Sequence, residues 1–117
     1  RPWLEQSPYA DKIKFYIGDA LERVPQLGIT FDLVFVDGDK RKYMEYYEMS
    51  LAHLSPGGYI IADNTLWAGH VTDTPNPNDA QTIGIQTFNE FVAKDNRVEK
   101  VILPLRDGLT IIRKKNE

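Results

Sequence analysis

A short run of apolar residues that ends abruptly in charged side chains constrains the fold of this chain more than any other feature. The run is Phe31–Val36, and Asp37, Gly38, Asp39 and Lys40 follow it directly. A near-continuous apolar run of this length is typical of a strand that is covered on both faces of a parallel sheet. In open α/β sheets, ligands bind just beyond the carboxyl ends of the strands. We therefore expect these charged residues to lie at a ligand-binding edge.

A second strand is expected after the helix that follows the first. Residues Lys40–Leu54 place apolar side chains at steps of three and four, which is typical of an amphipathic helix. Tyr59–Ala62 is another short apolar run, and it ends in Asp63 and Asn64. A strand, one crossover helix and a strand form a right-handed unit with parallel strands. Because parallel strands end at the same edge of a sheet, we expect Asp63 and Asn64 to converge with Asp37.

The rest of the chain predicts further elements of an α/β domain and a loop over the expected edge. Alternating residues indicate strands, helical spacing indicates helices, and the segment rich in Pro, Asn and Asp indicates a loop. The predicted elements are a short helical lead over Pro2–Ala10, a strand over Lys12–Ile17, a brief helix over Ala20–Leu27, a loop over His70–Ala80, a helix over Thr82–Asp95, and an antiparallel hairpin of Val98–Leu105 and Leu109–Ile112.

Composition limits the classes of protein to which the chain can belong. The chain has 117 residues, of which 26% are charged, a net charge of -3 and no cysteine. This length allows one domain, and the lack of a basic tract argues against a nucleic-acid partner. A chain without cysteine has no disulfide framework or thiolate metal site, which fits a reducing cytoplasm. No segment has the roughly 20 apolar residues of a membrane span, so we expect a cytoplasmic protein without a membrane partner.

The expected edge carries oxygen ligands of the kind that hard cations prefer. The carboxylates of Asp37 and Asp63 and the amide oxygen of Asn64 suit Mg²⁺, Mn²⁺ or Ca²⁺. A cation would also relieve the repulsion between the two carboxylates. Spacing alone favours the simpler interpretation, in which the aspartates cap turns after strands and Lys40 is a surface residue at a helix start. The turn at Asp19 and Ala20 also has two possible interpretations: it is a simple turn, or its backbone forms a platform for a purine ring.

Several short motifs follow one another along the chain. They are, in order, Val36-Asp-Gly-Asp-Lys-x-x-Tyr43, Tyr46-Tyr47-Glu48, Leu54-x-Pro56-Gly-Gly58, Ala62-Asp-Asn-Thr-Leu-Trp67-x-Gly69-x-Val71, Phe88-Asn89, Arg97-Val98, and Leu103-Pro104 with Asp107-Gly108-Leu109. No Gly-x-Ser-x-Gly elbow or glycine-rich phosphate loop points to another chemistry. Taken together, these motifs resemble those of the cation-dependent O-methyltransferases, which include caffeoyl-CoA and catechol O-methyltransferases. The resemblance runs from about Lys14 to Lys114.

The resemblance implies a Rossmann-like class I methyltransferase fold that uses S-adenosylmethionine (SAM) and a divalent cation, Mg²⁺, Ca²⁺ or Mn²⁺. It implies a small aromatic acceptor with a catechol-like hydroxyl, and a homodimer. By position, the resemblance implies that Asp37, Asp63 and Asn64 are the metal ligands. It implies that Lys40 is the general base and that Asp37 is a second catalytic residue. The implied cofactor contacts are Asp19, Ala20, Asp37 and Asp39, and Trp67 and Ala68 would border the acceptor. Plant members often carry a polar residue where Ala68 stands, which leaves the acceptor open.

The resemblance covers only the C-terminal part of the methyltransferase domain. The family's glycine-rich loop and its acidic ribose-binding residue do not precede Lys12, so residues 1–117 are expected to form a partial domain that lacks the first two strands. This part would consist of a mostly parallel sheet with an antiparallel C-terminal strand pair. We expect either an exposed edge beside Phe31–Val36 or an unfilled gap at the centre of the sheet. We also expect the chain to be a fragment of a longer enzyme and to be inactive on its own.

The alternative is a non-catalytic α/β module that binds Mg²⁺, similar to a receiver domain. Receiver domains also place an aspartate after a buried strand and a lysine further along the chain. They would, however, show an acidic pair after their first strand. The motif that begins at Asp63 has no role in them. The methyltransferase interpretation is therefore preferred.

Overall fold

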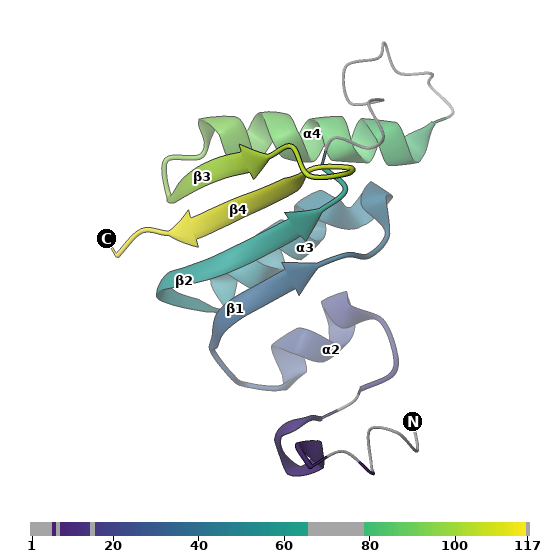
Figure 1. Cartoon of the computed structure of the whole chain (residues 1–117), viewed down its shortest axis with the longest axis vertical. Helices are drawn as coiled ribbons and strands as arrows, with labels where there is room; N and C mark the ends of the chain where they lie inside the picture. Colours follow the sequence, from purple (N-terminus) through teal and green to yellow (C-terminus); the bar gives the residue numbers. More distant parts are fainter. Residues whose placement is uncertain (1–5, 7, 15, 66–78, 117) are drawn as a thin grey trace.

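The computed structural model describes residues 6, 8–14, 16–65 and 79–116, which form an α/β structure (Figure 1). Apolar runs form the strands, and segments with helical spacing form the helices. In chain order the elements are η1 (Ala10–Lys12), α2 (Ala20–Gln26), β1 (Phe31–Val36), η2 (Lys40–Lys42), α3 (Tyr43–Ala52), β2 (Leu54–Asp63), α4 (Ala80–Lys94), β3 (Val98–Leu103) and β4 (Leu109–Lys114).

The four strands form one sheet in the order β1-β2-β4-β3. The pair β1 and β2 is parallel, with α3 as the crossover helix. Strand β4 runs antiparallel to both of its neighbours, β2 and β3. Three strands therefore point the same way and one points back (Figure 1). This arrangement confirms the α/β class and the antiparallel C-terminal pair that the sequence predicts.

Helices α3 and α4 cover one face of the sheet and enclose the core with it (Figure 1). The centre of this core is aromatic: the Phe88 ring packs edge to face against Tyr43 and Tyr47, with centroids 5.5 and 5.7 Å apart. Such pairs add about 0.5–1.5 kcal/mol beyond the area that they bury. The sheet contributes the buried side chains Val36, Ile60, Ala62 and Ile112, and the helices add Leu51, Ile85 and Val92.

The opposite face of the sheet is open and apolar. Leu33, Phe35, Tyr59 and Val101 are 58%, 58%, 43% and 53% exposed. Strand register places Leu33 beside Tyr59, and it places Phe35 and Val101 in one row across the sheet. Strand β1 has β2 on one side and no strand on the other among the described residues. Of the two expected alternatives, the described residues show the exposed edge and no gap between strands of the sheet.

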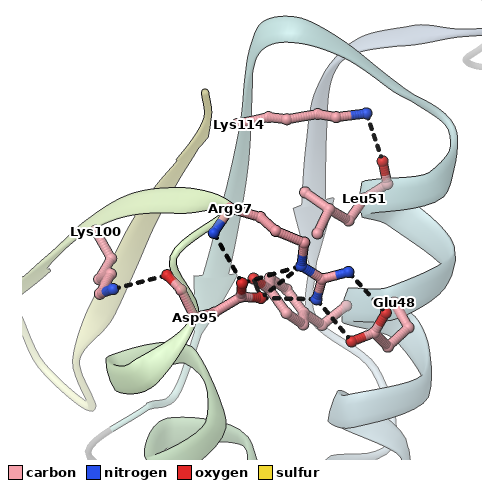
Figure 2. Close-up of polar contacts among 7 residues, drawn as sticks. Glu48, Leu51, Asp95, Arg97, Lys100 and Lys114 are labelled. Atoms are coloured by element: carbon pink, nitrogen blue, oxygen red, sulfur yellow. Dashed lines mark hydrogen bonds and ion pairs between the residues drawn. The ribbon is translucent and has the colours of Figure 1, made fainter. Parts of the chain in front are cut away.

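A buried carboxylate joins α3, α4 and the start of β3. Asp95 is 7% exposed and accepts a 2.6 Å hydrogen bond from the Tyr47 hydroxyl. The Arg97 guanidinium donates to the same carboxylate at 2.7 and 2.9 Å and pairs with Glu48 at 3.0 Å (Figure 2). These contacts join α3 to the end of α4 and to the residue just before β3.

Two lysines complete this polar cluster by binding backbone carbonyl groups (Figure 2). Lys114 donates to the Leu51 oxygen at 3.0 Å and to the Leu54 oxygen at 2.9 Å, and Lys100 donates to the Asp95 oxygen at 3.0 Å. The carbonyl groups at the end of a helix lack partners within the helix. Lys114 on β4 therefore caps the end of α3 and ties it to the sheet.

The predicted strand over Lys12–Ile17 is wrong. Lys12 ends η1, and the other described residues of this segment are irregular, with Ile17 60% exposed. Alternating side chains suit a strand, but a strand also needs a hydrogen-bonded neighbour. No described strand lies beside this segment.

Other differences from the predicted elements concern boundaries. The predicted helix over Lys40–Leu54 splits into η2 and α3, and β2 begins at Leu54 instead of Tyr59. Residues 55–58 of β2 lie opposite a single residue of β1, so the register shifts there. The predicted lead over Pro2–Ala10 and loop over His70–Ala80 fall largely outside the described residues. Among the helices that are described, none is both long and apolar enough to cross a membrane.

Candidate active site

The ends of β1 and β2 bring the predicted polar residues to one edge of the sheet. Val36 of β1 pairs with Ala62 of β2 in parallel register, so Asp37 and Asp63 follow at the same end. Asp37 has a half-exposed side chain (51%), so its carboxylate is accessible to a ligand. The geometry thus produces the convergence that the sequence predicts for these two carboxylates.

Lys40 lies beside Asp37 and is shielded from solvent. Its Nζ is 3.2 Å from Asp37 Oδ1 and 3.0 Å from the Gly38 carbonyl oxygen. The ammonium group also lies 4.9 Å from the centroid of the Tyr43 ring, within the range of a cation–π contact. The side chain is only 9% exposed. Lys40 is therefore part of the edge and not a free surface lysine.

Tyr43, the first residue of α3, connects the two strand ends. Its fully buried hydroxyl donates a 2.7 Å hydrogen bond to the Asp63 carbonyl oxygen and lies 3.4 Å from the Val36 carbonyl oxygen. Burial raises the pKa of Tyr43 well above its usual value, and the negative charges of Asp37 and Asp63 raise it further. The hydroxyl therefore remains a hydrogen-bond donor. From the sequence, Tyr43 is part of a motif and has no predicted role.

Asn64 has a conformation that few residues other than glycine adopt. Its φ is 61°, and its backbone N–H donates to Asp63 Oδ1 at 2.8 Å. The side-chain Nδ2 donates to Asp107 Oδ2 at 3.1 Å. An amide whose nitrogen is held by a carboxylate leaves its oxygen for another ligand. Asp107, in the turn between β3 and β4, is a site residue that sequence reasoning missed, although it belongs to a quoted motif.

The donor set fits a hard divalent cation. Two carboxylates and an amide oxygen lie at this edge, and the Lys40 ammonium balances one carboxylate. Within the described part of the chain, no group of three or more His, Cys, Asp or Glu side chains could hold a metal ion. For a cation at this edge, Asn64 would offer an amide oxygen in addition to the carboxylates of Asp37 and Asp63.

A cavity of about 290 Å³ lies between α2, β1 and α3, next to the polar edge. It is lined mainly by apolar side chains, and Asp37 and Ala20 of α2 are among its lining residues. Ligand sites are typically apolar cavities with a few polar groups that orient the ligand. Ala20 and Asp37, both predicted to contact the cofactor, thus line the same cavity.

The other two aspartates predicted to contact the cofactor cap helices. Asp19 accepts a 3.0 Å hydrogen bond from Leu21 N at the start of α2. Asp39 caps η2, and Arg41 binds its carboxylate at distances down to 2.6 Å. The hydrogen bonds from the Arg41 side chain and backbone lower the pKa of Asp39 to about 2. Neither aspartate is among the residues that line the cavity.

The predicted acceptor residues Trp67 and Ala68 lie outside the described residues. The described chain that leads to them is fixed at Thr65, which is fully buried. Asn89 of α4 donates to the Thr65 carbonyl oxygen at 2.8 Å, and Thr65 N donates to the Gly108 oxygen at 3.4 Å. Helix α4 and the turn after β3 therefore hold the backbone of Thr65 from two sides.

A family model described as O-methyltransferase matches residues 1–115. Tricin synthase 1 of Oryza sativa subsp. japonica is 37% identical over 128 residues, which cover 97% of this chain and 51% of the relative. Caffeoyl-CoA O-methyltransferase 1 of Eucalyptus globulus is 34% identical over 123 residues, covering 97% of this chain and 50% of that protein. The chain therefore spans about half the length of these relatives.

A solved structure shows the same fold. The O-methyltransferase TomG from Streptomyces achromogenes, which is involved in tomaymycin synthesis and was crystallised in complex with SAM, superposes with a TM-score of 0.87 and 30% sequence identity. The match covers 96% of this chain and 54% of TomG. The described strands and helices thus correspond to one half of a class I methyltransferase fold.

Proposed function

The chain belongs to the O-methyltransferase family, and on this premise we propose that it supplies the catalytic edge of an enzyme that methylates a hydroxyl group. The methyl donor would be SAM, and the acceptor a small aromatic molecule with a catechol-like hydroxyl. The convergence of Asp37, Asp63, Asn64 and Lys40 beside an apolar cavity supports this proposal most directly. Because the chain spans about half the length of these relatives, we propose the activity for the full-length polypeptide that carries this sequence.

We assign the cofactor to the cavity between α2, β1 and α3. Ala20 and Asp37 line it, which supports the cofactor contacts that the family resemblance implies. The relation to TomG, whose structure contains SAM, points to the same methyl donor. The apolar lining suits the adenine ring, while Asp37 provides a polar group among the lining residues. Asp19 and Asp39 would act from the cavity's border, where they fix the helix starts.

Asp37, Asp63 and Asn64 would hold the divalent cation, Mg²⁺, Mn²⁺ or Ca²⁺. A bound cation of this type lowers the pKa of a hydroxyl that it contacts. The chain's own contribution is to fix the ligands: Asp63 through the contact from Asn64 N, and Asn64 through Asp107. Trp67 and Ala68 would border the acceptor.

Lys40 is the residue that we assign to the acceptor's proton. The acceptor oxygen would form a bond to the methyl carbon as the bond from that carbon to sulfur breaks, and the bonding electrons would remain on sulfur. Lys40 Nζ, which lies beside Asp37, would first release one of its own protons to solvent, and the neutral amine would then accept the hydroxyl proton. Holding both reactants at one rigid edge supplies orientation, which contributes roughly 7–11 kcal/mol in well-aligned systems.

The test is titration of Mg²⁺ and of SAM into the full-length polypeptide by calorimetry, followed by methyl transfer from labelled SAM to caffeoyl-CoA and to catechol. We expect both ligands to bind and Asp63→Ala to abolish Mg²⁺ binding and Mg²⁺-dependent transfer. Asp32→Ala is the matched control, because Asp32 is an exposed aspartate at the opposite end of β1.

Two results would contradict the proposal in different ways. Mg²⁺ binding without any SAM binding would favour a non-catalytic module that binds Mg²⁺. SAM-dependent transfer that survives Asp63→Ala would remove the cation from the site while leaving the methyltransferase assignment in place.

A further inference from the structure

We propose that Tyr43 is a positioning residue of this site: its hydroxyl ties the carboxyl ends of β1 and β2 together and thereby sets the separation of Asp37 and Asp63. The inference rests on the proposed function, because it concerns the residues assigned to the cation. It gives a role to a side chain that would not itself contact the cation, the cofactor or the acceptor.

The contacts of Tyr43 reach both strand ends and the lysine. The hydroxyl donates to the Asp63 carbonyl at 2.7 Å, which holds the backbone of one proposed ligand. The same oxygen lies 3.4 Å from the Val36 carbonyl, one residue before Asp37. The ring lies 4.9 Å from Lys40 Nζ, which in turn contacts Asp37. One side chain therefore links the groups that would have to keep a fixed geometry.

The position of Tyr43 is itself fixed by the core. The side chain is fully buried, and its ring packs edge to face on Phe88 of α4 with an interplanar angle of 82°. A shift of the hydroxyl would require α3 or α4 to move. In protein metal sites, groups that orient the ligands typically change metal affinity by 10- to 100-fold when they are removed. We expect the Tyr43 hydroxyl to act in this way through the backbone of Asp63.

The same helix supplies a matched tyrosine for comparison. Tyr47 lies one turn further along α3, is equally buried, and packs on Phe88 at the same interplanar angle. Its hydroxyl donates a 2.6 Å hydrogen bond to Asp95, which ends α4 and precedes the start of β3. Removing either hydroxyl leaves one buried acceptor without this donor, but only Tyr43 contacts the candidate site.

The experiment compares Tyr43→Phe with Tyr47→Phe in the full-length polypeptide. Mn²⁺ affinity is measured by the electron paramagnetic resonance signal of free and bound Mn²⁺, and stability by thermal unfolding. Both variants should lose stability, because each breaks a buried hydrogen bond. Only Tyr43→Phe should weaken Mn²⁺ binding, by about 10-fold, while Tyr47→Phe keeps the wild-type affinity.

The possible failures are distinguishable. Equal Mn²⁺ affinity in wild type and Tyr43→Phe would overturn the positioning role and leave the proposed function intact, as would an equal loss in both variants. Absence of Mn²⁺ binding in the wild type would overturn the cation site and the inference with it. If Tyr43→Phe is partly unfolded, titration at a lower temperature, where circular dichroism gives both variants the same folded fraction, preserves the comparison.

Discussion

Asp95 is the residue whose environment most clearly links local contacts to stability. Hydrogen bonds from the Arg97 side chain lower the pKa of this carboxyl group far below its usual range, and the Tyr47 hydroxyl and Arg97 N–H lower it further, against the opposing effect of burial. Removing a hydrogen-bond partner from a charged group costs about 1.5–3 kcal/mol. The carboxylate of Asp95 therefore stabilises the junction of α3, α4 and β3 only while it is ionised.

The pH dependence follows from the lowered pKa of Asp95. An unfolded aspartate has a pKa near 3.9, so the stabilisation is complete above about pH 5 and is lost as the pH falls through and below 4. We expect Asp95→Asn to cost about 1–3 kcal/mol at pH 7 and to flatten the decline of stability in acid. Urea unfolding between pH 7 and roughly pH 3 measures both effects.

The control for this prediction is Asp11→Asn, because Asp11 is an exposed carboxylate near the start of the described chain. This variant should retain the acid decline of the wild type. A wild-type chain whose free energy of unfolding is the same at pH 7 and below pH 4 would contradict the role of Asp95.

Single site residues were predictable from sequence only where the backbone alone determines their place. Asp37 and Asp63 follow parallel strands, so strand assignment was sufficient to place them together. Tyr43 and Asp107 act through side-chain contacts between elements that are distant in sequence. Such contacts depend on how α3 and the β3–β4 turn pack, and no periodicity in the sequence encodes that packing.

At the scale of elements, the close approach of α4 to η2 supports the lysine of the site. A Cβ atom at Gly84 of α4 would lie 2.8 Å from Arg41 Cα and 3.1 Å from the Lys40 carbonyl carbon, and it would collide with the Lys40 carbonyl oxygen. Only a glycine allows the helix to pass this close to the backbone that carries Lys40. The helix and the short turn therefore pack backbone to backbone.

Gly84→Ala tests this packing, because the close approach predicts that the substitution lowers stability instead of raising it. Alanine inside a helix is normally more stable than glycine by about 0.5–1 kcal/mol. Here we expect a loss of about 1–3 kcal/mol, because overpacking forces the backbones apart. Thermal and urea unfolding measure the change, with Thr87→Ala on the exposed surface of α4 as control. A stabilised Gly84→Ala variant would contradict the close approach.

Sequence patterns were sufficient to predict some helices and strands but not others. The apolar run of β1 and the spacing in α4 predicted those elements to within a few residues. The strand predicted over Lys12–Ile17 failed because side-chain alternation says nothing about the neighbouring strand that must supply hydrogen bonds. The extension of β2 through residues 55–58 was missed because proline and glycine usually end a strand, whereas here the register shift accommodates them.

At the scale of the whole molecule, the open face and free edge of the sheet are the main exposed apolar features. Leu33 and Phe35 of β1 are each 58% exposed beside an edge that has no partner among the described strands. Exposed apolar faces and unpaired edges favour association with other chains. In the full-length polypeptide, homodimer formation, which we also propose, would be measured by light scattering.

The 117-residue chain on its own should self-associate through this face. We expect Leu33→Lys to shift the mass measured by light scattering toward that of a single chain, because a charge on an edge strand opposes pairing. The control, Glu45→Lys, also introduces a lysine, but at an exposed position of α3, and it should leave association unchanged. A wild-type chain that is monodisperse at the mass of one chain would show that this face does not drive association.

The strand order has a consequence for how the protein is made. Strand β4 follows β3 in the sequence but lies between β2 and β3 in the sheet. While a ribosome is still synthesising residues 109–114, β2 has no partner on that side and β3 has no place to pair. The hydrogen bonds that β4 makes with β2 and β3 therefore form last, after the βαβ unit of β1, α3 and β2 has emerged. A nascent chain that stalls before β4 would present an interior strand as an open edge.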